Sequence, residues 1–405
     1  MNRREFCKLG MLSFGASALS WGLPSKLWAQ QASPAPQFFI LVDFPGGWDT
    51  TLAADPWTNP VRLPEQDIFV EYREDELLPM GAHFAGPAME PLKNYFSRLA
   101  VVNGVFMARN DTGHDSASMY AKTGNGQGHL GVLSSELETR VVNSPFGILA
   151  DSSIYTAQAR RMIWDMMGLI NNGKIKDSGM LIDIPDKDSE LAKARSAILQ
   201  NLPKVKIFNQ EVAKGPTPLT KGHAIAAAFS SCLSGSVSLR VSKFFDTHSD
   251  HPKNHMTTLK DAFTEIKEII DILAATPGVG IPDSLLEQTT IMMVSEFTRT
   301  PALNASKGKD HNAQCNSAIL MGPGIKPGVI GGSKVVTRAE TRIANPYLVG
   351  LPLDKKTFQA VDHREDTFIL RPESVVATVA QSMGCNPATI SESLGQAPLL
   401  TPILV

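Results

Sequence analysis

Short apolar segments alternate with helical patterns along most of the chain, and this alternation constrains the fold more than any other feature. Apolar runs that suit strands buried on both faces occupy residues 38–44, 99–105, 236–242, 289–294 and 317–321. Helical patterns occupy residues 88–98, 115–123, 153–170 and 372–384, and a clear amphipathic repeat runs from Leu259 to Leu273. The sequence therefore predicts an α/β domain with a mostly parallel central sheet and helices on both faces.

The first 29 residues have the pattern of an export signal. The paired Arg3 and Arg4 precede an apolar stretch, residues 9–23, that is too short to span a bilayer comfortably, and small residues near Ala29 suit cleavage. We predict a twin-arginine signal over residues 1–29, passage of the folded protein through the twin-arginine export machinery, and a periplasmic or extracellular location. A short uncleaved anchor is the alternative interpretation.

The rest of the chain is expected to form a flexible leader over residues 30–37 and a single domain over residues 38–405. Residues 173–215 are rich in Lys, Asp and Pro with weak periodicity, which suggests an insertion. No later stretch has 18 consecutive apolar residues, so we expect no transmembrane segment in the mature chain.

Charge and cysteine content narrow the class of protein further. The chain has a net charge of −2, and removal of a signal of charge +3 leaves about −5, which argues against a nucleic-acid-binding protein. Three cysteines remain after residue 29, enough for one disulfide but not for a disulfide framework.

Polar residues that could do chemistry collect beside the predicted strands, where open α/β sheets bind their ligands. Carboxylates and imidazoles are zinc ligands, and manganese, magnesium or calcium accept oxygen-rich sets, so we predict a divalent metal site with zinc foremost. The candidates are Asp49 after the first strand, His114 and Ser116 after the second, Asp246, His248, His251 and His255 after the third, Glu296 and Arg299 after the fourth, and Asp310 and His311 before the fifth.

A metal at this edge would polarise an ester oxygen and lower the pKa of a bound water. Arg299 would suit an anionic oxygen of a phosphate or sulfate ester, and His114 or Ser116 could begin the attack. Each residue also has a structural interpretation. Asp49 could cap a turn, and Glu296 could simply pair with Arg299.

The same segments resemble the DUF1501 family, a group of exported proteins related to the alkaline phosphatase/sulfatase superfamily. The resemblance covers essentially the whole mature chain, and several linked motifs occur in the family's order. They are Pro45-Gly46-Gly47-Trp48-Asp49, Pro91-Leu92-Lys93 after His83, His114 through Thr123-Gly124, Phe245-Asp246-Thr247-His248, Ser295 to Pro301, and Asp310-His311 ahead of Gly322-Pro323-Gly324.

The resemblance implies an alkaline phosphatase/sulfatase-like fold and a set of metal ligands. It assigns a ligand role to Asp49, with Asp43 as the alternative, and to Asp246 with His248 or His251, together with Glu296 and His311. The sequence departs from the pattern at three places. His114 occupies the position of the hydrolase nucleophile, Gly113 replaces the usual Ser, and Phe297 replaces an expected His.

Two functions are consistent with these residues. The first is a metal-dependent hydrolase of small phosphate or sulfate esters. The second is a non-catalytic exported protein that keeps the fold and binds a glycan, an envelope component or a partner protein, and the departures from the family pattern favour it.

Overall fold

The computed structural model describes residues 35–57, 68–107, 113–123, 148–150, 203–204, 206–336, 346–362 and 365–405. The predicted signal over residues 1–29, the predicted helix over 153–170 and most of the predicted insertion near 173–215 lie outside these residues.

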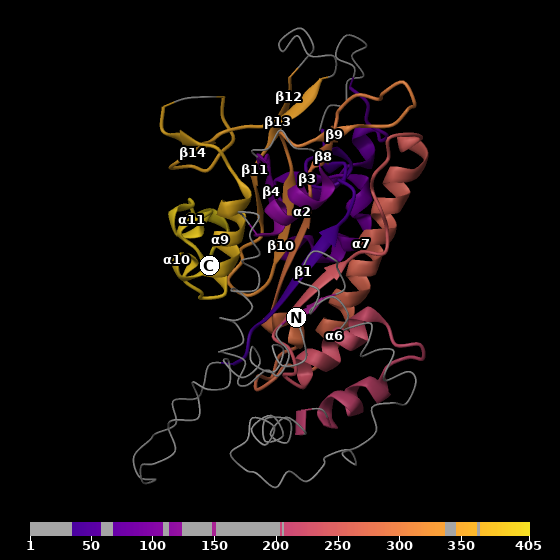
Figure 1. The fold of residues 1–405 in the computed structure, drawn as a ribbon, viewed down its shortest axis with the longest axis vertical. Coiled ribbons are helices and arrows are strands. Elements are labelled where there is room, and N and C mark those ends of the chain that lie inside the picture. Colours follow the sequence, from indigo (N-terminus) through magenta and orange to yellow (C-terminus); the bar gives the residue numbers. More distant parts are fainter. Residues whose placement is uncertain are drawn as a thin grey trace, which may run out of the picture.

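A seven-stranded sheet forms the centre of the described structure (Figure 1). Strand β10 is antiparallel to both of its neighbours, and every other pairing in the sheet is parallel. The predicted mixed α/β fold with a mostly parallel sheet is therefore confirmed. The strand order is β11 (Gly328–Gly331), β4 (Ala100–Asn103), β10 (Ser317–Met321), β7 (Thr289–Ser295), β1 (Phe38–Phe44), β6 (Ser236–Arg240) and β5 (Ile148–Ala150).

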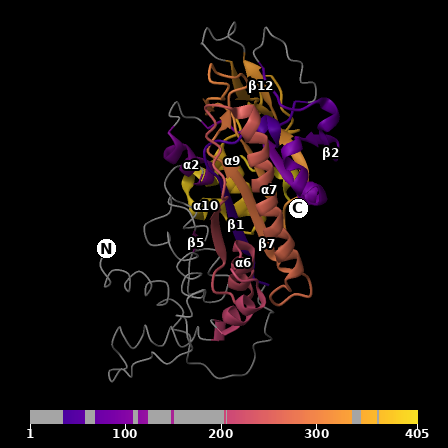
Figure 2. The same cartoon turned by 90° about the vertical axis from the view of Figure 1, so that its right-hand side faces the viewer.

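Helices cover both faces of the sheet because successive strand residues point to opposite sides. On β1, Phe38, Ile40 and Val42 join one apolar core, whereas Phe39 and Leu41 join the other. The first core packs against α6 (Lys221–Ser230), α7 (His251–Ala275) and the 3-10 helix η3 (Pro87–Arg98). The second packs against α2 (His114–Thr123) and α9 (Pro372–Ser382), so the sheet separates the two helical layers (Figures 1 and 2).

Short elements complete the described fold around these layers. The small helices are η1 (Thr50–Leu52), η2 (Glu74–Glu76), η4 (Leu285–Gln288), α10 (Pro387–Ile390), α11 (Glu392–Gln396) and η5 (Thr401–Ile403). The two-stranded pairs are β2 (Leu78–Met80) with β3 (His83–Ala85), β8 (Thr298–Arg299) with β9 (His311–Asn312), β12 (Ser333–Val336) with β13 (Tyr347–Gly350), and β14 (Leu353–Asp354) with β15 (Thr367–Phe368).

One edge of the sheet gathers the predicted site residues. Strands β1, β4, β6 and β7 run in the same direction, so their carboxyl ends and the loops that follow them lie at one edge. Because β10 runs the opposite way, its amino end lies at that same edge, and it brings along the segment with Asp310 and His311. The topology thus joins residues that are up to about 260 positions apart in the sequence.

Two further findings concern the membrane and the cysteines. Among the described residues, no helix is both long and apolar enough to cross a membrane. Among the described residues, Cys232, Cys315 and Cys385 form no disulfide with one another, so the pair that the sequence allowed is not formed.

Candidate metal centre

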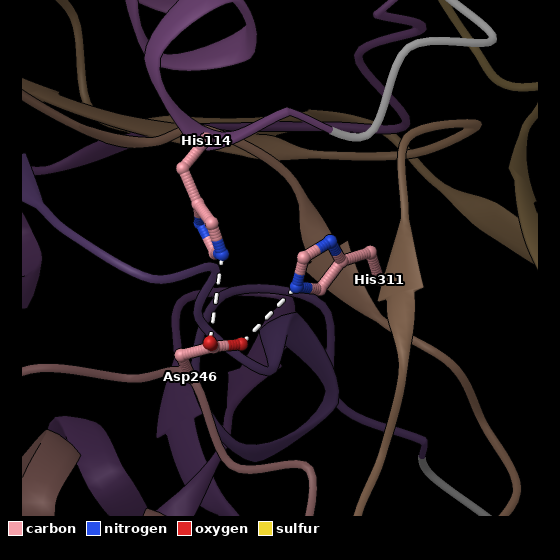
Figure 3. A group of neighbouring side chains, drawn as sticks. All are labelled: His114, Asp246 and His311. Atoms are coloured by element: carbon pink, nitrogen blue, oxygen red, sulfur yellow. Dashed lines mark hydrogen bonds and ion pairs between the residues drawn. The ribbon is translucent and has the colours of Figure 1, made fainter.

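Two histidines and one aspartate from three separate segments meet at this edge (Figure 3). His114 begins α2, Asp246 follows β6, and His311 begins β9. One donor atom from each side chain lies within 4.8 Å of the other two. His311 Nε2 lies 3.1 Å from Asp246 Oδ1, and His114 Nε2 lies 3.5 Å from Asp246 Oδ2.

His248 adds a third imidazole to this group. Its Nε2 lies 3.1 Å from Asp246 Oδ1 and 3.0 Å from His311 Nε2. Three imidazole Nε2 atoms therefore face the two oxygens of one carboxylate. We call Asp246, His114, His248 and His311 the four-residue centre.

Two further carboxylates contact the Nδ1 atoms of two of these imidazoles, on the side away from the centre. Glu296 lies within hydrogen-bonding distance of His114 Nδ1, and Asp310 Oδ1 lies 3.0 Å from His248 Nδ1. A neutral imidazole that donates from Nδ1 keeps its lone pair on Nε2, which is the tautomer that binds a metal. Both histidines can thus present Nε2 to the centre as an acceptor.

The electrostatics of these carboxylates differ with their burial. Glu296 is buried, and this burial raises its pKa, although His114 and the Gly46 N–H, which donates at 2.8 Å, oppose the effect. Asp310 is half-exposed, and although partial burial would raise its pKa, hydrogen bonds from Asn304 and His248 lower it.

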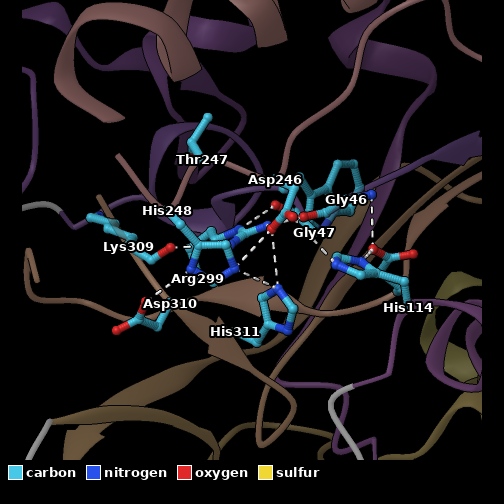
Figure 4. Close-up of polar contacts among 12 residues, drawn as sticks. Gly46, Gly47, His114, Asp246, Thr247, His248, Arg299, Lys309, Asp310 and His311 are labelled. Atoms are coloured by element: carbon cyan, nitrogen blue, oxygen red, sulfur yellow. Dashed lines mark hydrogen bonds and ion pairs between the residues drawn. The ribbon is translucent and has the colours of Figure 1, made fainter. Parts of the chain in front are cut away.

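Arg299 orients the Asp246 carboxylate by a hydrogen bond. The guanidinium is fully buried and donates to Asp246 Oδ1 at 2.7 Å, to the Gly47 carbonyl at 2.9 Å, to the Lys309 carbonyl at 3.0 Å and to the Gly46 carbonyl (Figure 4). Burial alone would raise the pKa of Asp246, but hydrogen bonds from Arg299 and His311 bring it down to about 2. Asp246 is therefore an ionised carboxylate that can serve as a ligand.

The Gly46-Gly47 turn allows this close packing. Both residues have positive φ, at 99° and 80°, a region that L side chains rarely adopt. A Cβ on Gly46 would lie 2.6 Å from the Asp246 nitrogen, and one on Gly47 would lie 2.4 Å from the Phe297 ring. The two glycines are therefore required where the turn passes beneath the centre.

Phe297 fills the space that the resemblance assigned to another histidine. Its ring centroid lies 4.5 Å from that of His311 and 5.6 Å from that of His114. The ring is fully buried. It supports two imidazoles by packing and supplies no ligand atom.

A buried ion pair anchors the helix that carries His114. Lys122, near the end of α2, is fully buried with its Nζ 2.6 Å from Asp43 Oδ2 on β1. Arg240 Nε approaches the same oxygen at 3.2 Å. Removal of Asp43 would leave the buried Lys122 ammonium without this counter-charge, so the pair favours the observed position of α2 on the sheet.

Asp49 and His251 lie in a second cluster at the same edge. Asp49 Oδ1 accepts from the Thr51 N–H and hydroxyl, and it caps η1, while Oδ2 accepts from Lys309 Nζ at 2.5 Å and from His251 Nε2 at 3.1 Å. Although burial opposes the effect, the Lys309 charge lowers the pKa of Asp49. The capping interpretation of Asp49 is therefore the one that its contacts support.

Thr247 connects this second cluster into a ring. The Thr247 hydroxyl lies 2.7 Å from His251 Nδ1 and 2.8 Å from His255 Nδ1, and His255 Nε2 accepts from the Asp49 N–H at 2.8 Å. We call Asp49, His251, Thr247 and His255 the Asp49 ring. Burial lowers the pKa of His251 to about 4 and that of His255 well below its usual value, so both imidazoles are neutral at pH 7.

Glu71 lies against the Asp49 ring. Its Oε1 is 3.7 Å from His251 Nε2 and is buried without a hydrogen-bond partner among the described residues. Burial, together with the nearby Asp49 charge, raises the pKa of Glu71 to about 7.

Comparison with known proteins bears on these segments. A family model described as a protein of unknown function, DUF1501, matches residues 228–348. This match supports the DUF1501 family for the chain. The matched segment contains every residue of the four-residue centre except His114, together with Glu296, Arg299 and Asp310.

The other comparisons add little to the DUF1501 match. No curated protein matches the chain. The solved structure of PH0037 protein from Pyrococcus horikoshii is similar over 73% of this chain and 88% of that chain, with 14% sequence identity and a TM-score of 0.27. A likeness this weak carries no argument about fold or function.

The predicted site residues fall into five groups. Four form the centre, Glu296 and Asp310 hold its imidazoles, and Arg299 holds its carboxylate. Asp49 and His251 belong to the Asp49 ring. Ser116 lies in the first turn of α2, where its hydroxyl donates to the Gly113 carbonyl at 3.2 Å. Glu296 and Arg299 do not pair with each other as the structural interpretation expected.

Sequence reasoning assigned no role to four residues that lie in or beside the two clusters, namely Thr247, Lys309, Glu71 and Lys122. Thr247 and Lys122 lie within quoted family motifs, but those motifs gave neither side chain a function. Thr247 and Lys309 are adjacent to predicted ligands, and that adjacency was the available signal. Nothing in the sequence distinguishes Glu71 or Lys122 from the other charged residues around them.

Proposed function

We propose that the chain binds one divalent metal ion, with zinc the best-suited ion, through the four-residue centre. One observation carries the proposal. Three imidazole Nε2 atoms face one ionised carboxylate, while separate carboxylates hold the Nδ1 atoms of two of these imidazoles. Nitrogen and carboxylate ligands oriented by outer carboxylates are typical of protein zinc sites.

The proton count of the centre fits a cation. Once His248 donates from Nδ1 to Asp310, only one proton can lie between His248 Nε2 and His311 Nε2 at 3.0 Å. A bound cation would replace that proton and compensate the negative charges of Asp246, Glu296 and Asp310. Zinc suits this nitrogen-rich set better than calcium or magnesium does, because those two ions prefer oxygen.

We further propose hydrolysis of a small phosphate or sulfate ester. A zinc ion, when bound, polarises an ester oxygen and lowers the pKa of a water. The centre is open to solvent, since its side chains are between 16% and 47% exposed. In this account Arg299 holds Asp246 in place, and Glu296 and Asp310 fix the imidazoles and share their protons.

The wider assignment stays part of this proposal. An alkaline phosphatase/sulfatase-like fold is supported by ligands at the carboxyl edge of a mostly parallel sheet. Twin-arginine export to the periplasm or the exterior is supported only by the residue 1–29 pattern. A small anionic ester or glycan remains the proposed ligand.

A specific observation favours the non-catalytic alternative. Arg299, the expected partner of a substrate anion, is fully buried and already donates to Asp246 and three carbonyls. The Ser116 hydroxyl donates to the carbonyl of Gly113, three residues earlier in the chain. A metal-containing protein that binds a glycan or a partner would need neither residue.

Turnover of defined esters by zinc-loaded protein separates these functions. We would measure hydrolysis of p-nitrophenyl phosphate, bis-p-nitrophenyl phosphate and p-nitrophenyl sulfate, with Asp246→Asn as the site variant and the exposed Glu90→Gln as its control. The hydrolase is supported if the protein binds zinc and hydrolyses one of these esters, and if Asp246→Asn abolishes the hydrolysis while Glu90→Gln does not. Zinc binding without turnover of any ester supports the alternative, and absence of zinc binding contradicts both.

A further inference from the structure

The segment Phe245–His248 alternates in direction between the core and the four-residue centre. Phe245 is fully buried in the apolar core, whereas Asp246 and His248 point into the centre. Figure 4 shows Thr247 pointing away from the centre. Its hydroxyl lies against the imidazoles of His251 and His255 on α7. Thr247 therefore shares a backbone with two of the proposed ligands, but its side chain lies on the opposite side of that backbone.

The hydrogen bonds of the Asp49 ring run in one direction. The Asp49 N–H donates to His255 Nε2, so the proton of neutral His255 is on Nδ1 and is donated to the Thr247 oxygen. The single Thr247 O–H then donates to His251 Nδ1. His251 therefore carries its proton on Nε2 and donates it to Asp49 Oδ2, which closes the ring.

Burial makes this ring a rigid anchor. His251 and His255 are fully buried, and their rings stack with centroids 4.3 Å apart in the first two turns of α7. The Thr247 hydroxyl is the acceptor for one imidazole and the donor for the other. A buried polar group that loses its partner costs about 1–3 kcal/mol, so the ring resists displacement of Thr247.

Backbone contacts fix the segment that carries Thr247, Asp246 and His248 against the segment before β9. The Lys309 N–H donates to the Thr247 carbonyl at 3.0 Å, which ties the segment to the strand that carries His311. A Cβ on Gly308 would lie 1.9 Å from the His248 carbonyl carbon, so this approach is closer than any other residue permits. Thr247 therefore sits where a small shift would move Asp246 and His248 together.

We propose that Thr247 is a positioning residue, through which the buried His251–His255 pair sets the geometry of the metal ligands Asp246 and His248. This inference rests on the proposed metal binding. Loss of the hydroxyl should weaken metal binding even though Thr247 is not a ligand, in the way that loss of an outer hydrogen bond weakens metal sites about 10- to 100-fold.

The test compares Thr247→Val, Thr247→Ser and a matched control in the full chain. Thr378→Val removes a fully buried hydroxyl on α9, which donates to the Ser374 carbonyl and accepts from the Leu400 N–H beside the second apolar core. Zinc affinity is measured by competition with a chromophoric chelator, and the ligand geometry by the visible spectrum of the cobalt-substituted protein. We expect Thr247→Val to bind zinc at least about tenfold more weakly with an altered cobalt spectrum, and Thr247→Ser and Thr378→Val to resemble wild type.

Wild-type protein provides a readout that does not depend on the variants folding. Nitrogen-15 spectra of the imidazoles should show the Nδ1–H tautomer for His255 and the Nε2–H tautomer for His251. The opposite tautomer at either residue overturns the inference. Equal zinc affinity in Thr247→Val and wild type overturns it while metal binding stands, and a wild-type chain that binds no metal overturns both.

Discussion

Glu71 should make the stability of the protein fall as the pH rises through the neutral range. Its side chain is only 8% exposed, and its Oε1 has no hydrogen-bond partner among the described residues. Burial raises its pKa from 4.5 to about 7. Glu71 therefore binds more protons in the folded state than in the unfolded state between these two values, and its contribution to stability must decrease with pH across that window.

The size of the effect follows from the two pKa values. Each pKa unit corresponds to about 1.4 kcal/mol, so full ionisation of Glu71 costs about 3 kcal/mol of unfolding free energy. The stabilising contribution of the neutral carboxyl is complete below about pH 4.5. It is lost progressively and is gone above about pH 7.

The assay is urea unfolding of wild type and Glu71→Gln between pH 5 and pH 8.5. Because the amide mimics the neutral carboxyl, the variant should be more stable than wild type by about 2–3 kcal/mol at pH 8, and the difference should shrink toward pH 5. The exposed Glu90→Gln is the control and should follow wild type. A Glu71→Gln curve parallel to wild type across this range would refute the argument.

Three other substitutions test the packing around the centre. Gly47→Ala should cost at least about 2 kcal/mol in urea unfolding, because it places a Cβ against a buried ring at positive φ, and a cost under 0.5 kcal/mol would contradict this. Lys122→Met should cost about 3 kcal/mol, because it leaves the buried Asp43 carboxylate with the partly exposed Arg240 in place of two counter-charges, and Lys122→Met/Asp43→Leu should recover most of that loss. Glu296→Gln should weaken zinc binding about 10- to 100-fold in a chelator competition with little change in melting temperature, because His114 loses its carboxylate; unchanged affinity would count against the ligand role of His114.

The central fold was predictable because its signals are local. The run from Phe38 to Phe44 has no alternating polar residues, and it forms β1 over the same bounds. The apolar spacing from Leu259 to Leu273 lies within α7. Strand order and the antiparallel direction of β10 were not predicted, since they depend on pairing between segments distant in sequence.

The centre was predictable to the extent that parallel strands end at one edge. That rule places His114 and Asp246 near each other without any knowledge of side-chain geometry. The same rule does not place His311, which precedes β10 and reaches this edge only because β10 is antiparallel to its neighbours. It could not distinguish Asp49 from Asp246, because both follow strands that end at the same edge. The two carboxylates differ because the buried ammonium of Lys309 donates to Asp49, and Lys309 lies 260 positions further along the chain.

The roles of the charged residues around the centre depend on burial, which the sequence does not show. Glu296 and Arg299 are three positions apart and looked like partners or like a base and an anion site. In the structure each is buried and turned to a different member of the centre. Arg299 donates to the carbonyls of Gly46 and Gly47. No local sequence pattern predicts such hydrogen bonds from a side chain to a distant backbone.

Metal content is the measurement that tests the central claim most directly. Elemental analysis of the purified full-length protein would be set beside the Asp246→Ala/His311→Ala double variant, with Glu90→Gln as control. The account predicts about one equivalent of zinc in wild type and control and none in the double variant. Wild type without bound metal after zinc loading, or a double variant that keeps its metal, would contradict the account.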